Sequence, residues 1–281
     1  MDKRHLVGVA ALLLAGGMAT AQVHSASQPQ KLVSAQVGLM APVWSPDGSM
    51  IAVTSDNYKG IYVADADGSN LRILTNDDGA GYKMAWSADG RSLAGRANVV
   101  EGKKIQHQMR SYGLDGTTKA VGQLRRTTAQ PGVQKVETIY GVMATDPAGA
   151  TRRIPALAQF QGRTIINPAL SPDGSQVAFQ VPGKGMWLVS ADGSDLRSLG
   201  KGSHPAWMPD SRTLLYTIVE DNGAEFTAST LMSLDVRTGF SATVVSASDM
   251  LPLTPAVAPD GSKVAFENAL DASIYVVNLK K

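Results

Sequence analysis

The chain alternates between short apolar segments and compact polar turns from about residue 31 to its end. The apolar segments are rich in Val, Ile, Leu and aromatic residues, which favour β-strands. The turns contain Pro, Asp, Gly and Ser, which are typical of tight strand reversals. This pattern predicts an all-β protein built from hairpins.

A five-residue motif recurs and divides the chain into units. Its fullest form is Trp44-Ser45-Pro46-Asp47-Gly48, and an alternating apolar segment follows every copy. The copies begin at Trp44, Trp86, Leu170, Trp207 and Val257. Their aspartates, Asp47, Asp89, Asp173, Asp210 and Asp260, are 42, 84, 37 and 50 residues apart, so the second interval holds two periods. Spacing near 40 residues is typical of β-propeller blades.

The double interval predicts a degenerate unit in the middle of the chain. Pro131-Gly132 lies where the turn of that unit would fall, and residues 140–149 resemble the later half of a unit. With this unit included, we expect six.

A second turn follows in most units and completes the strand count. Residues 61–74 and 186–199 each place an Asp-Gly turn between two apolar segments, and weaker versions occur at 112–116 and 234–239. In the Pro-Asp-Gly turn, Pro fixes φ, Asp bonds the local backbone and Gly accepts a positive φ. Two hairpins give four short strands per unit. We therefore predict a six-bladed β-propeller of four-stranded antiparallel blades.

The two ends of the chain predict how the ring closes. The last unit stops after its third strand, at residues 274–279, whereas residues 31–35 precede the first unit as an unmatched strand. We expect this N-terminal strand to complete the last blade, since closure removes exposed sheet edges.

The repeated motif resembles the WD40-like PD repeats of TolB-like propellers, which also occur as N-terminal domains of prolyl-oligopeptidase-like enzymes. The resemblance covers residues 31–281 and implies the propeller fold, but it is weak for function. TolB itself has an α/β domain before its propeller, and the peptidases have a hydrolase domain after theirs. We expect neither here, because only residues 22–30 precede the first strand and two lysines end the chain.

The N-terminus has the features of an export signal. Lys3, Arg4 and His5 precede an apolar run over residues 6–14, and small residues lead to Ala21. This order predicts a signal peptide, residues 1–21, cleaved after Ala21. We expect residues 22–30 to form a flexible linker and residues 31–281 the propeller. The mature protein is then periplasmic or secreted, and it has no membrane span, because the apolar run is too short for one.

Composition limits the chemistry that the chain can perform. The formal net charge is +2, which indicates no nucleic-acid partner, and the chain contains no Cys for disulfides or thiolate sites. We expect a monomer held together by its core.

Known catalytic signatures do not occur in the sequence. It lacks a Gly-x-Ser-x-Gly elbow, a Walker loop and a dinucleotide-binding glycine motif. Residues 65–68 begin like a calcium loop but lack its later ligands, and the four His residues have no paired spacing. We therefore predict no catalytic residue, no metal site and no cofactor. The Trp positions share their register with Leu170 and Val257, which favours packing between blades over a ligand platform.

Propeller topology points to one face as the binding surface. The Pro-Asp-Gly and Asp-Gly turns share one face, whereas the loops between second and third strands, and between blades, lie on the other. Those loops are irregular, and irregular loops on a rigid scaffold commonly bind ligands. We expect the site among Asp56, Tyr58, Asp78, Tyr82, Glu101, His204, Glu220, Glu225, Asp249 and Glu267. The face with the regular turns is the alternative.

Two main functions fit these observations. The first is an exported, non-enzymatic propeller that binds a protein, peptide or glycan partner in the cell envelope through its loop-rich face. The alternative is a stand-alone propeller hydrolase or lyase with a carboxylate/His site at the central channel. A third hypothesis is an envelope scaffold similar to the TolB system without its first domain.

Overall fold

Short antiparallel strands make up almost all of the regular structure. The computed structural model describes residues 23–25, 27–121, 135–138, 142–145, 151–153, 155–160 and 163–280. The predicted signal peptide, residues 1–21, lies outside the described residues.

Five sheets each fill four strand positions. The first blade contains β3 (Leu39–Trp44), β4 (Met50–Ser55), the short helix η1 (Asp56–Tyr58), β5 (Lys59–Asp65) and β6 (Arg72–Thr75). The second contains β7 (Ala85–Trp86), β8 (Ser92–Glu101), β9 (Lys104–Gly113) and β10 (Thr118–Ala120). The third contains β14 (Ile166–Leu170), β15 (Gln176–Val181), β16 (Gly185–Ser190) and β17 (Arg197–Gly200).

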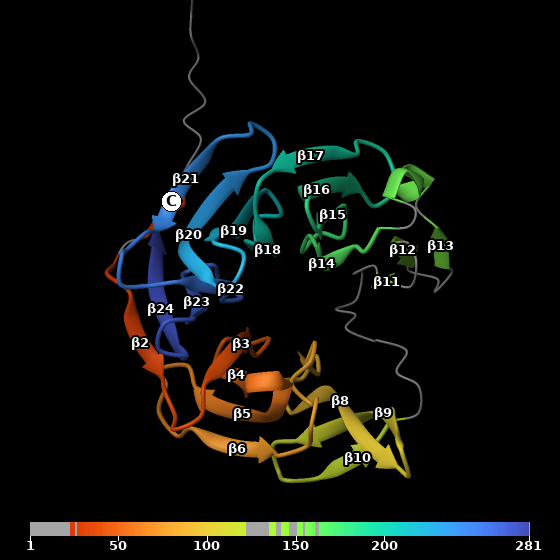
Figure 1. Cartoon of the computed structure of the whole chain (residues 1–281), viewed down its shortest axis with the longest axis vertical. Helices are drawn as coiled ribbons and strands as arrows, with labels where there is room; N and C mark the ends of the chain where they lie inside the picture. Colours follow the sequence, from red (N-terminus) through yellow and green to blue (C-terminus); the bar gives the residue numbers. More distant parts are fainter. Residues whose placement is uncertain are drawn as a thin grey trace, which may run out of the picture.

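The last two blades follow the same order. The fourth contains β18 (Ser203–Trp207), β19 (Thr213–Asp221), β20 (Phe226–Asp235) and β21 (Ser241–Val245). The fifth contains β22 (Pro252–Val257), β23 (Lys263–Asn268) and β24 (Ser273–Lys280), and β1 (His24–Ser25) and β2 (Gln30–Val33) both pair with β24. The blades lie around a central channel, with their first strands innermost (Figure 1).

The predicted number of blades was wrong, since the described residues form five four-stranded blades rather than six. Between the second and third blades in the chain, β11 (Lys135–Thr138), β12 (Val142–Thr145) and β13 (Thr151–Arg153) form a three-stranded sheet, and η2 (Pro155–Phe160) follows. The sequence has no full Ser-Pro-Asp-Gly turn in this stretch, which removes the residues that join a first strand to a second. Pro131-Gly132 lies outside the described residues.

The recurring tryptophans join neighbouring blades. Trp44, Trp86 and Trp207 are buried. Each indole Nε1–H donates to a first-strand carbonyl of the preceding blade, with acceptors Ala256, Val43 and Ala169 at 3.0, 3.0 and 2.9 Å. The Trp44 bond therefore crosses the seam between the first and the fifth blade. These contacts confirm the predicted packing role.

The Pro-Asp-Gly turns are held by their own side chains. Ser45 Oγ donates to Asp47 Oδ1 at 2.6 Å, and Asp47 also accepts the backbone N–H of Ser49 at 3.1 Å. The hydrogen bond from Ser45, with those from Ser49, lowers the pKa of Asp47 to about 2. The same bonds recur in the turns at Asp89 and Asp173.

Successive turns also touch one another. Gly48 has a φ of +71°, and a Cβ placed there would lie 3.5 Å from Pro259 Cδ of the fifth blade. A Cβ at Gly261 would lie 3.1 Å from Pro209 Cδ of the fourth blade. The motif thus provides both the strand reversal and a contact between adjacent blades.

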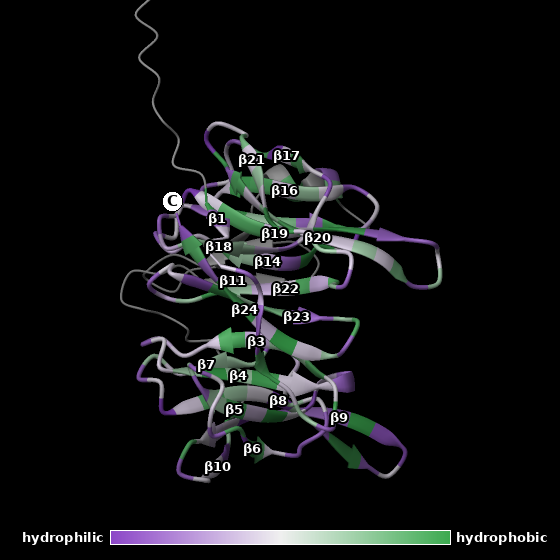
Figure 2. Ribbon diagram, turned by 90° about the vertical axis from the view of Figure 1, so that its left-hand side faces the viewer, coloured by the Kyte–Doolittle hydropathy of each residue, from purple (hydrophilic) through white to green (hydrophobic). Residues whose placement is uncertain are grey.

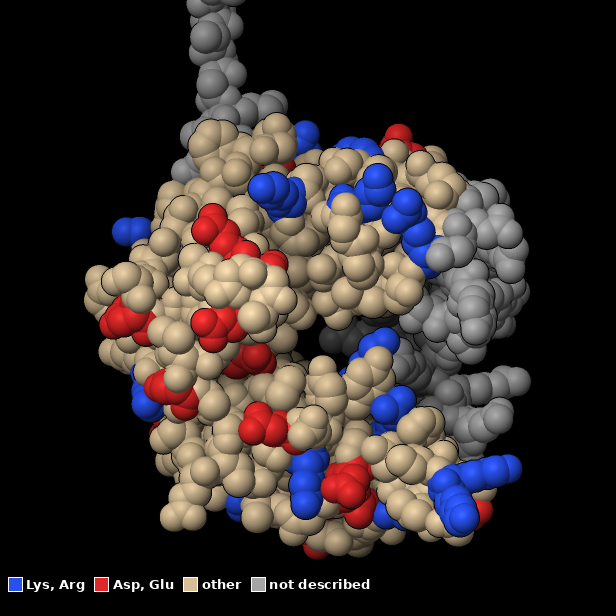
Figure 3. All heavy atoms as spheres, in the orientation of Figure 1, with Lys and Arg blue, Asp and Glu red and all other residues tan. Residues whose placement is uncertain are grey.

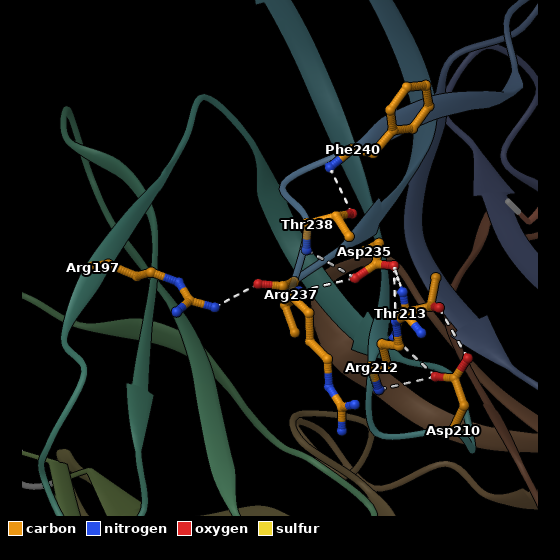
Figure 4. Close-up of polar contacts among 9 residues, drawn as sticks. Arg197, Asp210, Arg212, Thr213, Asp235, Arg237, Thr238 and Phe240 are labelled. Atoms are coloured by element: carbon orange, nitrogen blue, oxygen red, sulfur yellow. Dashed lines mark hydrogen bonds and ion pairs between the residues drawn. The ribbon is translucent and has the colours of Figure 1, made fainter. Parts of the chain in front are cut away.

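Arginines extend these links on the fourth blade (Figure 4). Arg212 Nε donates to Asp235 Oδ2 at 2.8 Å, joining the first turn of the blade to its second. Arg197, from β17 of the third blade, donates to the backbone carbonyl of Val236. Side chains on this face are therefore largely engaged in holding turns together.

The N-terminal strand closes the ring as predicted. In the pairing of β2 with β24, Gln30 lies opposite Val276 and Lys31 opposite Tyr275. The closing segment begins earlier than expected, because β1 lies within the segment predicted to be a flexible linker, and His24 pairs with Lys280. The reason is burial: Val23 is only 1% exposed in the core of the fourth and fifth blades. We call residues 23–33 the clasp.

The described part of the chain contains no helix long and apolar enough to cross a membrane.

Candidate functional site

The two faces of the propeller differ in shape. The hairpin loops β8–β9 and β19–β20 project from one face, which also carries the other loops between second and third strands (Figure 2). We call this the loop-rich face and the opposite one, with the Pro-Asp-Gly turns, the turn face. Figure 3 shows the loop-rich face, with the channel opening at its centre and Lys or Arg side chains on the rim.

An irregularity at the start of the first strands forms the rim of this channel mouth. Ala41, Lys83, Asn167, His204 and Thr254 all have φ between 43° and 53°. Each lies three residues before the recurring Trp, Leu or Val, and four of the five precede a proline. Strand pairing shifts register there in four blades. Positive φ is uncommon for such residues, but its repetition around the ring makes it part of the blade design.

A second polar position faces this irregularity from the second strands. It is occupied by Thr54, Arg96, Gln180, Thr217 and Glu267, each directly after three mainly apolar residues. Asn167 Nδ2 donates to Gln180 Oε1 at 3.1 Å, and Thr254 Oγ1 donates to Glu267 Oε2 at 2.7 Å. The two positions therefore make a polar layer whose chemistry differs from blade to blade.

Aromatic and cationic side chains meet at the mouth near the first and second blades. The Tyr58 and Tyr82 rings pack edge to face, with centroids 5.1 Å apart. Arg96 Cζ lies 4.4 Å and Lys83 Nζ 5.4 Å from the centroid of the Tyr82 ring, both within cation–π range. The Nε of Arg96 is buried and has no hydrogen-bond partner among the described residues. Arg96 therefore has a hydrogen-bond donor that no described residue uses.

The loop that carries Tyr82 can approach only because residue 81 is glycine. The Gly81 N–H donates to the Tyr58 carbonyl at 3.1 Å. A Cβ at Gly81 would lie 1.9 Å from Thr54 Oγ1, closer than any real contact. This close packing between the first and second blades fixes the two tyrosines relative to each other.

Glu267 joins this cluster from the fifth blade. Its carboxylate is buried and accepts the Ala41 N–H at 2.9 Å as well as the Thr254 hydroxyl. Burial raises the pKa of Glu267, and the nearby negative charge of Asp56 adds to the rise. Burial also raises the pKa of Tyr58, with further contributions from Tyr82 and Glu267. Asp56, Tyr58, Tyr82 and Glu267, four of the predicted site residues, therefore lie close together.

The other predicted residues lie apart from this cluster. His204 occupies the rim position of the fourth blade, where burial lowers its pKa and its Nδ1 has no partner among the described residues. Asp78 is exposed and forms an ion pair with Lys59 at 3.9 Å. Glu101, at the tip of the β8–β9 hairpin, accepts a bond from Gln106 at 2.6 Å.

Three acidic candidates lie on the fourth and fifth blades, Glu220 near the end of β19 and Glu225 and Asp249 in loops. Glu220, Glu225 and Asp249 are exposed. Glu225 lines a separate hollow of about 500 Å³ together with Phe226 and Leu270.

Lys83 and Arg96 were missed by the sequence analysis. The signal was available in the repeat: an alignment on the motif places Lys83 with His204, and Arg96 with Glu267. They were overlooked because Lys83 lies just after the irregular segment that was singled out, residues 76–82, and Arg96 lies within β8 rather than in a loop.

The turn face has a hollow of its own at the other end of the channel. It measures about 350 Å³, and half of the residues that line it are Pro or Trp, including Pro46, Pro259, Trp44 and Trp86. These are the repeated residues that pack the blades.

Among the described residues, no three His, Asp or Glu side chains come together in a way that could hold a metal ion. The donors available at the channel mouth suit an anion better than a cation.

A comparison with a solved structure supports the fold. No family model matches the chain. An oligogalacturonate lyase solved in complex with manganese has a TM-score of 0.51 at 15% identity, and the match covers 94% of this chain and 99% of that one. TolB from Acinetobacter baumannii has a TM-score of 0.39 at 14% identity, covering 90% of this chain and 57% of that one.

A curated relative matches part of the sequence. The chain is 26% identical over 141 residues to a Bacillus subtilis (strain 168) protein named uncharacterized peptidase YuxL. That match covers 49% of this chain and 21% of the relative, so the chain spans about a fifth of that protein. The likeness to the oligogalacturonate lyase supports the propeller fold and, at such low identity, carries no activity.

Proposed function

We propose that the protein is an exported, non-enzymatic propeller whose loop-rich face binds an acidic glycan at the channel mouth. The observation that carries this proposal is the placement of Arg96. Its guanidinium lies over the Tyr82 ring with Lys83 nearby, and its Nε is buried without a hydrogen-bond partner among the described residues.

A buried donor without a partner is unfavourable unless water or a ligand satisfies it. A guanidinium can form two parallel hydrogen bonds to a carboxylate, and such charge-assisted bonds are stronger than neutral ones. Lys83 adds a second positive charge close to the same ring. A sugar carrying a carboxylate would satisfy Arg96 and could pack its ring on Tyr58, which is only half-buried.

The location is part of the proposal. The predicted signal peptide supports export to the periplasm or beyond, where acidic polysaccharides of cell envelopes and walls are accessible. The oligogalacturonate lyase likeness suggests a polyuronate as the first ligand to test, although that protein shares only the fold.

The alternative is a lyase or hydrolase at the same mouth. The observation in its favour is that Tyr58 and Glu267 have raised pKa values at one site, and shifted pKa values are typical of acid–base groups. The Glu267 carboxylate already accepts two hydrogen bonds from the protein, which favours a structural role.

Calorimetric titration with a galacturonate oligomer tests the proposal. We expect binding that weakens about tenfold or more in Arg96→Gln, since a charged hydrogen bond contributes about 1.5–3 kcal/mol. Arg91→Gln is the matched control, because Arg91 is exposed and lies at the turn-face end of the same β8 hairpin. The fully methyl-esterified oligomer should bind weakly.

The same samples separate the two functions. Incubation of the oligomer with the protein should leave its length unchanged and generate no unsaturated or reducing ends. Chain cleavage that disappears in Tyr58→Phe would support the enzyme instead, and equal binding by Arg96→Gln and the wild type would reject the anion site.

A further inference from the structure

A second hollow on the loop-rich face has chemistry opposite to that of the channel mouth. It measures about 500 Å³ and is lined by Asp221, Gly223, Ala224, Glu225, Phe226, Leu251, Ala269 and Leu270. These residues come from the tip of the β19–β20 hairpin, the β23–β24 loop and the connection that enters β22. We call this surface the acidic hollow.

The floor of the acidic hollow is fixed by hydrogen bonds. The Leu251 N–H donates to Asn268 Oδ1 at 2.8 Å, and the Ala269 N–H donates to the Leu251 carbonyl at 3.0 Å. The rim is also ordered, because Asp221 Oδ1 accepts the Gly223 N–H at 3.0 Å. The shape therefore exists before any partner arrives, which lowers the entropic cost of binding.

Two large apolar side chains are exposed beside this floor. Phe226 is 50% exposed and Leu270 is 57% exposed, while Leu251 between their loops is buried. Exposed apolar side chains that converge on one hollow indicate a contact surface more than isolated ones do. Covering them would remove apolar area from water.

Negative charge surrounds the apolar floor. The three segments, residues 220–226, 246–251 and 267–272, contain six Asp or Glu residues and no Lys or Arg; of the six, Glu267 faces the channel mouth and Asp271 pairs with Lys31, which leaves four for the acidic hollow. Figure 3 shows acidic side chains gathered over the blades formed by β18–β24. In the described part of the chain, Glu220, Glu225 and Asp249 form no ion pair.

We propose that the acidic hollow binds an extended peptide segment of a partner protein, with one large apolar side chain flanked by Lys or Arg. The apolar side chain packs between Phe226 and Leu270, and the flanking cations pair with Asp221 and Glu225. Charge complementarity selects this occupant, because an acidic or uncharged segment would leave the carboxylates unmatched. The inference goes beyond the glycan site and shares no residue with it.

Fluorescence anisotropy with a labelled peptide, Gly-Lys-Lys-Phe-Lys-Lys-Gly, tests this proposal. We expect saturable binding that weakens as salt rises, because exposed charges are screened. Replacing the peptide's Phe by Ser, or its four Lys by Glu, should reduce the affinity about tenfold or more.

Matched variants locate the site. Phe226→Ser and Leu270→Ser should each weaken binding about tenfold, and Glu225→Gln about threefold. Phe240→Ser is the control, since Phe240 is 51% exposed and lies at the opposite end of β20, on the turn face. Glu101→Gln controls for loss of one carboxylate on another loop. Unchanged melting curves confirm that each variant folds.

Three results would overturn the proposal. They are equal affinity for the Glu-containing peptide, an equal loss in Phe240→Ser and Phe226→Ser, or no saturable binding by the folded wild type. The β8–β9 tip of a second copy, which carries exposed Ile105 beside Lys103 and Lys104, is the rival occupant. Sedimentation showing self-association that both Phe226→Ser and Ile105→Ser abolish would replace the peptide by that second copy. Arg96→Gln should bind the peptide normally, which separates this test from the glycan test.

Discussion

The two ends of the channel are built from different kinds of residue. At the turn face, repeated Pro, Trp and Asp side chains contact the next blade or their own turn, and the hollow there is mainly apolar. At the loop-rich face, the rim position three residues before the recurring Trp, Leu or Val is Ala, Lys, Asn, His or Thr, depending on the blade. The facing position on the second strands includes Arg96 and Glu267. Positions that repeat hold the ring together, and positions that vary give each blade a different polar chemistry at the channel mouth.

Electrostatics follow the same division. The turn aspartates have lowered pKa values because nearby hydroxyl and N–H groups donate to them. At the loop-rich mouth, burial raises the pKa of Glu267 and Tyr58 and lowers that of His204. On the turn face, neighbouring donors therefore stabilise the charged form of the aspartates. On the loop-rich face, burial disfavours the charged forms of Glu267, Tyr58 and His204.

The largest expected effect comes from removing the clasp. Deleting residues 23–33 takes away both strands on β24 and the buried Val23 and Val33 side chains. Burial of one such side chain contributes about 1.5–3 kcal/mol, and 1 kcal/mol corresponds to about 2–4 °C at this size. Calorimetry should show a melting temperature at least about 10 °C lower. An unchanged melt would show that the ring does not depend on this closure.

Removing one indole donor should have a smaller effect. Trp44→Phe keeps most of the buried ring but loses the bond to Ala256 across the seam. We expect a loss of about 1–3 kcal/mol in unfolding free energy, because the acceptor stays buried. Urea titration should give a similar loss for Trp86→Phe, whose bond joins the first and second blades. A loss confined to Trp86→Phe would mean that the closing seam is held in another way.

A pair of glycine substitutions separates folding from binding. Gly81→Ala should displace the Tyr82 loop, because the added Cβ would overlap Thr54. Gly90→Ala, on the turn face, has a φ of +67° and only Pro46 Cδ within reach, at 3.8 Å. We expect a cost of about 1 kcal/mol for Gly90→Ala and unchanged glycan affinity. Gly81→Ala should weaken glycan binding in titration calorimetry, and equal affinities in the two variants would contradict the distinction between the faces.

The smallest effect is the pH dependence of the turn aspartates. Their folded pKa values lie below the unfolded value of about 3.9. Their stabilisation is therefore present above that value and is lost as pH falls through the folded values, about 2 for Asp47. Melting temperatures measured from pH 5 to 2 should fall, and less steeply in Asp47→Asn. Identical slopes in wild type and variant would contradict this assignment.

Much of the fold could be predicted from the sequence because the turn chemistry is local. Ser45, Pro46, Asp47 and Gly48 carry out their roles within one turn, and the unmatched strand at residues 31–35 identified the closing strand. The blade count failed where that local signal was lost, between Gly90 and Ser171. The position of β1 also could not be predicted, because it depends on the burial of Val23 between two distant strands.

The candidate site could be predicted only in part. The loops containing Tyr58 and Tyr82 stood out by their irregularity, and the structure brings them together. Arg96 did not stand out, because it lies within a strand. Its candidate role depends on its contact with the Tyr82 ring of a neighbouring loop, which the sequence does not reveal. Contacts between elements far apart in sequence leave no local pattern.

Hydrogen exchange measured with and without a galacturonate oligomer tests the central claim most directly, because it reports both faces at once. The account predicts slower exchange at residues 56–60, 79–84 and 95–98, around the channel mouth. It predicts no change at residues 45–49 and 87–91, in the turns of the same two blades. Protection of the turns instead of the mouth would contradict the assignment of binding to the loop-rich face.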